Sequence, residues 1–189
     1  MPTRLSQSLR RVITGRVALV GLLIFLVFGA TVLPAQARKA EAASAGSGSP
    51  DVSLFYAPED LTGMAEAYGE TGRAEYIQAR WTFDLAFPLV YGFFYLTAIT
   101  WLFNKGFQPG SRWQLANLVP IGAVIFDVLE NAATSIVMGM YPQGAPLAAA
   151  LAPWFTLVKW ILVGGSSVLL AVGVAAAAYA GLRRSRRQL

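Results

Sequence analysis

The chain contains neither cysteine nor histidine among its 189 residues. It therefore forms no disulfide, has no thiol nucleophile, and holds no metal site or proton relay that uses an imidazole ring. Charged residues are also scarce, at 13% of the chain against about a quarter in soluble domains. Hydrophobic residues make up 56%, and the mean hydropathy is +0.52. This composition argues against a soluble domain and is typical of an integral membrane protein.

Four long apolar segments account for the high hydropathy. Each reaches or nearly reaches the roughly 17–25 residues that a helix needs to cross the hydrocarbon core of a bilayer. The segments cover residues 17–33, 81–103, 115–140 and 154–182. We therefore predict an all-α fold, an integral membrane four-helix bundle.

Basic residues are concentrated at the two ends of the chain. Residues 1–16 and residues 183–189 each contain four arginines and no acid, whereas residues 34–80 contain four basic residues and seven acids. Basic residues beside a span favour the cytoplasmic side. The pattern predicts a multi-pass protein of the bacterial plasma (inner) membrane, with basic tails at 1–16 and 183–189 in the cytoplasm and residues 34–80 outside.

The first apolar segment, residues 17–33, has two interpretations. It follows a basic region and precedes Ala35-Gln36-Ala37, which resembles the cleavage site of a secretory signal peptide. Its 17 residues exceed the roughly 7–15 of a usual signal peptide, which favours a retained helix or uncleaved signal anchor. Cleavage after Ala37 would leave three spans, and both termini are cytoplasmic only if the helix is retained.

The segment between the first two spans is predicted to have two parts. Residues 34–57 are rich in alanine, glycine and serine, which is typical of a flexible extracytoplasmic linker. Pro58, followed by two acids, is typical of a first helical turn. We expect Gly69 and Gly72 to interrupt this helix, and a second short helix to lead from there into the membrane. This extracytoplasmic helical cap and three spans would together form residues 58–182, with the cap lying on the outer surface or acting as a lid.

Four ionisable side chains lie inside apolar segments, where lipid cannot solvate them. Insertion scales put the cost at about 2.5–3.5 kcal/mol for each such residue at mid-helix, and thus on the order of 10 kcal/mol for four. That is comparable to the net stability of a whole domain, about 5–15 kcal/mol. The four residues are Asp84, Asp127, Glu130 and Lys159. We expect them to face one another and not the lipid.

Helical spacing supports one polar cluster. Asp127, Glu130 and Asn131 fall on one face of a helix. At about 1.5 Å per residue, Asp84, Glu130 and Lys159 would all lie in the outer half of the membrane. Arg80 would sit at its rim, and Tyr91 would supply a hydroxyl group. The predicted ligand-binding or polar cluster consists of Arg80, Asp84, Tyr91, Asp127, Glu130, Asn131 and Lys159.

Three functions remain open for this cluster. It contains three carboxylates against two cations, and the excess acid favours binding of a small polar or cationic ligand or a lipid headgroup. Alternatively, the protein is an intramembrane enzyme that acts on a lipid or isoprenoid, with Asp127 and Glu130 as acid and base and Lys159 stabilising negative charge. The third possible function is that of a structural or accessory membrane subunit, in which the cluster only holds helices together. The residues specify no cofactor and no metal site, although a hard cation needs only oxygen ligands.

Two further patterns concern partners. Gly173, Ala177 and Gly181 recur at four-residue intervals, which is typical of close helix packing within a bundle or in a homo-oligomer. The basic tails lack interleaved aromatic residues, so we expect contacts with membrane lipids and none with nucleic acid.

Four motifs together resemble an uncharacterised family of small bacterial four-helix integral membrane proteins. They read YGETGRAEY, RWTFDLAFPLVYG, FDVLENAAT and LVKW, and the resemblance covers roughly residues 58–163. It implies a four-helix membrane fold and transfers no activity and no catalytic role.

Overall fold

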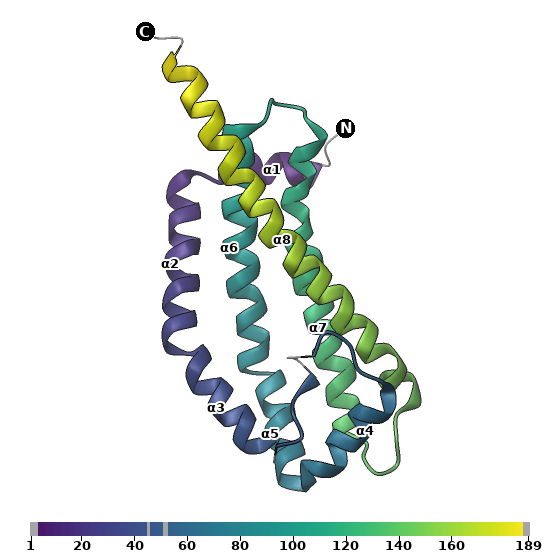
Figure 1. Cartoon of the computed structure of the whole chain (residues 1–189). Coiled ribbons are helices and arrows are strands. Elements are labelled where there is room, and N and C mark those ends of the chain that lie inside the picture. Colours follow the sequence, from purple (N-terminus) through teal and green to yellow (C-terminus); the bar gives the residue numbers. More distant parts are fainter. Residues whose placement is uncertain (1–3, 45, 51–52, 187–189) are drawn as a thin grey trace. The chain divides into compact units, whose positions relative to one another are not determined.

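Every regular element in the described part of the chain is a helix, which confirms the all-α prediction there. The structure, a computed structural model, describes residues 4–44, 46–50 and 53–186. The helices are α1 (Arg4–Val12), α2 (Gly15–Thr31), α3 (Leu33–Ala43), α4 (Pro58–Ala67), α5 (Gly69–Arg80), α6 (Phe83–Gly106), the 3₁₀ helix η2 (Arg112–Leu118), α7 (Val119–Gly139) and α8 (Pro146–Arg186) (Figure 1).

Four helical stretches of the described chain are long and apolar enough to cross a membrane, as the sequence predicts. They cover Gly15–Ala42, Gly69–Gly106, Arg112–Gly139 and Pro146–Arg186. In the first and the last of them, only 11% of the most apolar window is buried. Large side chains such as Val27 and Ile161 are more than half exposed. Apolar surface of this extent has to be covered by lipid or by another protein surface.

Helix α3 occupies the first part of the predicted flexible linker. It follows α2 after a single residue, Val32, and continues to Ala43. The stretch PAQARKAEAA consists mostly of strong helix formers, and Pro34 stands in the first turn, where its missing N–H is tolerated. Gly46 and Gly48, which have φ of +81° and +80°, follow the helix. Helix propensity therefore outweighs the linker-like alanine content as far as Ala43.

Helix α4 begins at Pro58, as predicted. The Ala57 N–H donates to Asp60 Oδ2 over 2.8 Å, which satisfies one donor at the helix start. The chain turns at Gly69, whose φ of +62° is in the left-handed region that favours glycine. Gly72 lies inside α5 and is buried. The predicted break at Gly72 is therefore wrong, because the turn needs left-handed backbone only at Gly69.

The described helices divide into two compact units. Unit 1 comprises residues 1–26, 90–122 and 162–189, and unit 2 comprises residues 27–89 and 123–161. Helices α2, α6, α7 and α8 contribute residues to both. All ten acids of the chain belong to unit 2, whereas unit 1 contains ten basic residues and no acid.

Unit 1 depends on close packing between α6 and α8. A Cβ atom built on Gly106 would lie 2.6 Å from Ala176 Cβ, and one on Gly173 would lie 2.9 Å from the Phe103 ring. Side chains do not approach so closely, so the two helices meet where glycine leaves room. A Cβ on Gly181 would meet no atom of the described chain within 4 Å. Packing between copies of the chain through Gly181 stays a prediction.

Unit 2 has an apolar core in which α4 and α5 pack against α7 and α8. The core residues are Tyr56, Leu61, Ala65, Tyr68, Tyr76, Ala133, Val137, Met138, Ala149 and Ala152. The Tyr68 hydroxyl donates to the Gly48 carbonyl over 2.7 Å, which attaches the preceding loop to α4. The short helices after Pro58 are thus packed onto the long ones and form part of the same core.

Prolines occur in α6, α7 and α8. Pro120 is the second residue of α7, where a missing N–H is tolerated. Pro88 lies inside α6, and Pro153 lies inside α8. A proline inside a helix leaves the carbonyl four residues earlier without its usual donor. At Pro88 that carbonyl belongs to Asp84.

Candidate functional site

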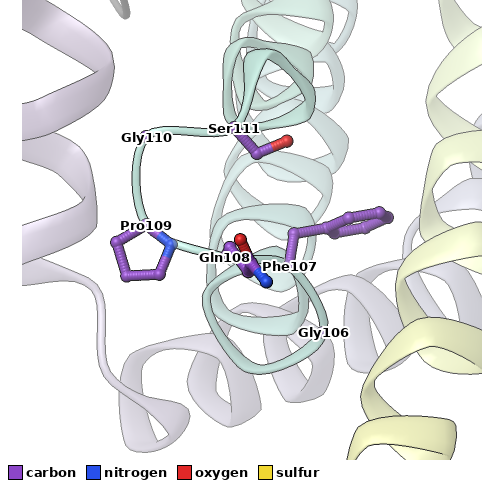
Figure 2. A pocket seen from close by; sticks show the side chains of 6 residues that line it. All are labelled: Gly106, Phe107, Gln108, Pro109, Gly110 and Ser111. Carbon is purple, nitrogen blue, oxygen red and sulfur yellow. The ribbon is translucent and has the colours of Figure 1, made fainter.

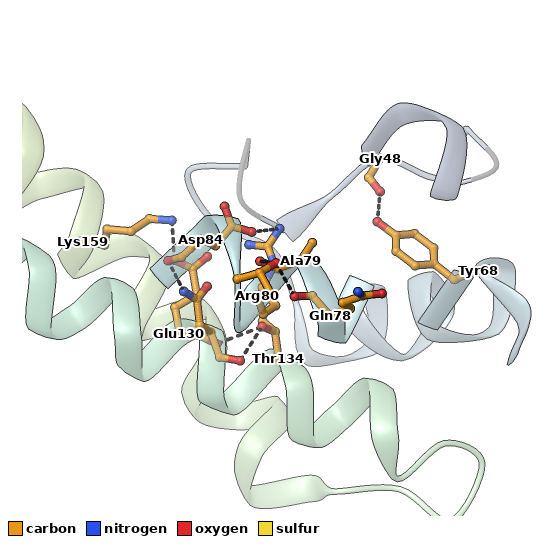
Figure 3. A network of polar contacts seen from close by, with 11 residues as sticks. Gly48, Tyr68, Gln78, Ala79, Arg80, Asp84, Glu130, Thr134 and Lys159 are labelled. Atoms are coloured by element: carbon orange, nitrogen blue, oxygen red, sulfur yellow. Dashed lines mark hydrogen bonds and ion pairs between the residues drawn. The ribbon is translucent and has the colours of Figure 1, made fainter. Parts of the chain in front are cut away.

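Four charged side chains of unit 2 form two ion pairs (Figure 3). Lys159 Nζ on α8 pairs with Glu130 Oε2 on α7, and their side chains are 7% and 0% exposed. Arg80 Nη2, at the end of α5, lies 2.9 Å from Asp84 Oδ2 in the first turn of α6. Burial of an ionised group is tolerated when an opposite charge and hydrogen bonds compensate it. The structure thus brings together four of the predicted charged residues as two compensated pairs.

One face of α7 supplies most of the polar groups. Asp127, Glu130, Asn131 and Thr134 follow one another at spacings of three or four residues and therefore share this face. All four are less than one tenth exposed. Thr134 Oγ1 donates to the Glu130 carbonyl over 2.9 Å, so its hydroxyl is used within its own helix. The predicted polar face of this helix is confirmed as a buried face.

Both carboxylate oxygens of Glu130 are engaged. Oε2 pairs with Lys159, and Thr156 Oγ1 donates to Oε1 over 2.8 Å. The Tyr56 hydroxyl lies 3.1 Å from Thr156 Oγ1, which extends the chain of polar groups to the segment before α4. Sequence reasoning missed Thr156, although it precedes Lys159 by three residues and so shares its helix face. It also missed Tyr56, for which the sequence offers no signal.

Asn131 meets α6 at the carbonyl group that Pro88 leaves without a donor. Asn131 Nδ2 donates to the Asp84 main-chain oxygen over 2.8 Å. In a regular helix this oxygen would accept from the N–H of residue 88, which is a proline here. The side-chain amide of α7 therefore replaces a main-chain bond of α6. This bond joins the two helices next to the Arg80–Asp84 pair.

Both cations of the cluster make cation–π contacts with aromatic rings. The Arg80 guanidinium carbon lies 4.4 Å from the centre of the Tyr76 ring, and Lys159 Nζ lies 5.2 Å from the centre of the Trp160 ring. Such contacts contribute about 0.5–2 kcal/mol, with the larger values in desolvated sites. Arg80 thus has a ring on one side and the Asp84 carboxylate on another, which fixes its orientation.

Apart from Glu130 Oε2, which is paired with Lys159, two buried polar atoms of α7 have no hydrogen-bond partner among the described residues. They are Asn131 Oδ1 and Ser135 Oγ, which stand four residues apart on the same helix face. Both residues are at least nine-tenths buried. Buried polar groups are almost always hydrogen-bonded in native proteins, and each exception calls for a partner. Asn131 Oδ1 can only accept, so its partner has to be a donor.

The two remaining predicted residues lie in different units. Asp127, which is 8% exposed, belongs to unit 2 and precedes Glu130 by three residues on α7. Tyr91, which is 5% exposed, belongs to unit 1, where its ring centre lies 6.5 Å from that of Tyr95. Unit 2 thus contains six of the seven predicted residues, and Tyr91 is a buried residue of unit 1.

The arrangement favours binding over proton transfer. The six predicted residues of unit 2 bring three carboxylates and two cations, which leaves one formal negative charge. Glu130 is held by a cation and a hydroxyl group, so its oxygens are already occupied as acceptors. Among the residues that the structure describes, no three acidic, cysteine or histidine side chains gather as metal ligands. The six residues together therefore carry a net formal negative charge.

A hollow of about 570 Å³ in unit 1 lies beside the loop between α6 and η2 (Figure 2). Its lining residues are Gly106, Phe107, Gln108, Pro109, Gly110 and Ser111. None of these six side chains is ionisable, and Gly110 with φ of +87° shapes the turn. The hollow lacks the converging charged or nucleophilic groups that distinguish the cluster in unit 2.

No protein-family model, curated protein or solved structure matches this chain. The resemblance to small bacterial four-helix membrane proteins therefore stays a prediction. The case for a function depends on the residues of unit 2.

The hydrogen bond between the hydroxyl groups of Tyr56 and Thr156 can be tested directly. Tyr56→Phe removes the group that bonds to Thr156 and leaves the ring in the core, so we expect the free energy of unfolding to fall by about 0.5–1.5 kcal/mol. Thermal unfolding of the purified protein measures this change. Tyr179→Phe, at an exposed position of α8, is the control and should leave the midpoint unchanged. Equal midpoints for Tyr56→Phe and wild type would contradict the bond.

Proposed function

We propose that this chain is a multi-pass membrane protein that binds a small cationic, hydrogen-bond-donating ligand in the polar cluster of unit 2. Amines are the simplest chemistry of this kind, either as free molecules or as the amine headgroup of a phospholipid. The four long apolar helices would form a bundle in the plasma membrane of a bacterium. Both terminal tails would be cytoplasmic, and the cluster would lie in the outer half of the membrane.

Charge distribution supports this orientation. The acids outside the spans lie between α2 and α6, whereas all charged residues of the tails are basic and the loop between α6 and η2 is flanked by Lys105 and Arg112. Because basic segments favour the cytoplasmic side, the acid-rich part containing α4 and α5 would face outward. That part packs directly onto α7 and α8, so it would cover the cluster from outside.

The observation that carries the proposal is the buried Asn131 acceptor. Its Oδ1 atom has no donor among the described residues, in a group of side chains with one excess carboxylate. A ligand N–H would satisfy this oxygen, and its positive charge would compensate the excess acid. Ser135 Oγ offers a second contact on the same helix face. A purely apolar ligand would satisfy neither requirement, and an anionic ligand would add to the negative charge.

Ser135→Ala and Asp127→Asn are expected to weaken binding at least about tenfold, the effect of losing one hydrogen bond to a charged group. Without ligand, Ser135→Ala should keep the wild-type unfolding temperature, because the hydroxyl has no partner in the described chain. Binding is measured as the rise in unfolding temperature with ethanolamine or spermidine, using protein in nanodiscs of amine-free lipid. Nanodiscs that contain phosphatidylethanolamine test the headgroup form of the ligand.

Ser166→Ala is the matched control. Ser166 is a buried serine in unit 1 whose hydroxyl donates to the Leu162 carbonyl of its own helix, so the substitution should leave amine binding unchanged. If no amine and no amine lipid raises the unfolding temperature of the wild-type protein, the proposal fails. Equal affinity for ethanolamine and for uncharged ethylene glycol would also contradict it, because the charge would then play no part.

The ion pairs favour a second candidate function, a structural role in which the cluster only joins helices. Glu130 connects α7 to α8 through Lys159 and Thr156, and Asn131 connects α7 to α6. Such a subunit would show no ligand effect in any lipid. Asp127→Asn would then change stability without a binding phenotype, which separates this candidate from the first.

A further inference from the structure

Most of the basic residues of unit 1 are exposed, and the unit contains no acidic side chain. Nine basic residues of this unit lie within the described chain, and all except Arg10 are exposed. The exposed ones are Arg4, Arg11, Arg16, Lys105, Arg112, Arg183, Arg184 and Arg186. Because unit 1 contains no carboxylate, none of these charges can be neutralised by an acid of the same unit. A surface of this kind attracts an anionic partner.

Helix α1 is fixed to unit 1 through one of its faces. Ser6, which is fully buried, donates from Oγ to the Gln114 carbonyl of η2 over 3.0 Å. Arg10 Nε donates to Asn104 Oδ1 over 2.7 Å, and Asn104 Nδ2 donates back to the Arg10 carbonyl over 3.3 Å. Helix α1 therefore lies against η2, which begins at Arg112, and against the end of α6, which contains Lys105. Figure 1 labels α1 and α6.

The other side of α1 is both apolar and basic. Leu5 and Val12, which are seven residues apart and hence on one face, are 53% and 72% exposed. Arg4 and Arg11 precede them by one residue each, so they form a second exposed row beside the first. An exposed apolar row with a flanking basic row is typical of helices that lie in the membrane interface.

We propose that α1, together with Lys105 and Arg112, is a docking surface for anionic phospholipid. Leu5 and Val12 would enter the acyl boundary, while Arg4 and Arg11 would bind the headgroup phosphates, for which the arginine fork is suited. The apolar row selects a lipid surface over nucleic acid, because a phosphate backbone offers no apolar phase for Leu5 and Val12. The inference depends on the membrane location of the chain and is independent of the ligand proposed for unit 2.

The test measures selectivity for anionic lipid. The full chain in neutral detergent is mixed with equal amounts of phosphatidylglycerol and phosphatidylcholine, and bound lipid is counted by native mass spectrometry. Arg4→Gln/Arg11→Gln is expected to reduce the preference for phosphatidylglycerol about thirtyfold, which corresponds to two basic residues near a membrane surface. In the wild-type protein the preference should fall as salt is raised, because exposed charges are screened.

Arg38→Gln/Lys39→Gln is the matched control. It removes the same charge from exposed positions of α3 in unit 2 and should leave lipid selectivity unchanged. An equal loss in both double variants would overturn the proposal, since net charge alone would then explain the effect.

Three further outcomes would also overturn it. Leu5→Gln/Val12→Gln should weaken binding to phosphatidylglycerol vesicles, and unchanged binding would exclude insertion of α1. Competition by free glycerol phosphate as strong as that by the lipid would indicate a site for a soluble anion. Tighter binding of a DNA oligomer than of the vesicles would show that the basic surface serves nucleic acid.

Discussion

Replacement of Lys159 with methionine is expected to lower the free energy of unfolding by about 3–5 kcal/mol, the usual effect of leaving one charge of a buried pair without its partner. Methionine retains most of the side-chain volume, so the loss of stability would come from the unpaired charge of Glu130 and not from a cavity. Glu130 would keep the hydrogen bond from Thr156 but would lose its cation at a position with no exposed surface. Reversible unfolding in mixed detergent micelles measures the difference, and folded yield in membranes should fall with it.

Adding Glu130→Gln to Lys159→Met should recover much of the lost stability. Glutamine has no charge to compensate, and its oxygen still accepts from Thr156, so the double variant should be more stable than Lys159→Met alone. Lys105→Met, at an exposed position, is the control for removing a lysine and should leave stability unchanged. A Lys159→Met protein as stable as wild type, or a double variant no better than the single one, would contradict the buried pair.

Asn131→Leu is expected to lower the free energy of unfolding by about 1–3 kcal/mol, because it removes the donor to a carbonyl that Pro88 has deprived of its helix partner. Leucine has a similar size, so packing is largely retained. The midpoint of thermal or denaturant unfolding measures the effect. The same substitution removes Oδ1, so amine binding by the proposed site should be lost as well.

Pro88→Ala provides the rescue. Alanine returns an N–H four residues after Asp84, so the double variant Pro88→Ala/Asn131→Leu should recover most of the stability that Asn131→Leu loses. It should not recover ligand binding, which separates the structural role of Nδ2 from the proposed role of Oδ1. Pro153→Ala in α8 is the matched control and should give no rescue. Additive effects of Pro88→Ala and Asn131→Leu would show that the amide does not replace the missing helix bond.

The two predictions concern different helix pairs in unit 2. Lys159 and Thr156 join α8 to α7 through Glu130, and the Asp84 carbonyl joins α6 to α7 through Asn131. If both hold, α7 is the helix on which the cluster is organised. A ligand at Asn131 Oδ1 would then bind to a helix held on two sides, which limits the ordering that binding has to supply.

Several features of this protein follow from the sequence alone. Four apolar segments of sufficient length dictate the long helices, since a span has to satisfy its main-chain groups internally. The spacing of Asp127, Glu130 and Asn131 dictates that they share a helix face, since that depends only on the helical repeat. The charges inside the spans indicate that Glu130 and Lys159 have to find partners, because lipid cannot solvate them.

Only the tertiary structure decided which partner each group takes. The sequence does not show that Lys159 pairs with Glu130, that Arg80 pairs with Asp84, or that the Asn131 amide meets the carbonyl freed by Pro88, since these contacts depend on how neighbouring helices are rotated and spaced. Tyr56 reaches Thr156 from a stretch with no periodic pattern, so no local signal marks it. Helical repeat and solvation are local properties of a sequence, whereas the pairing of side chains from separate helices is settled only when the helices pack.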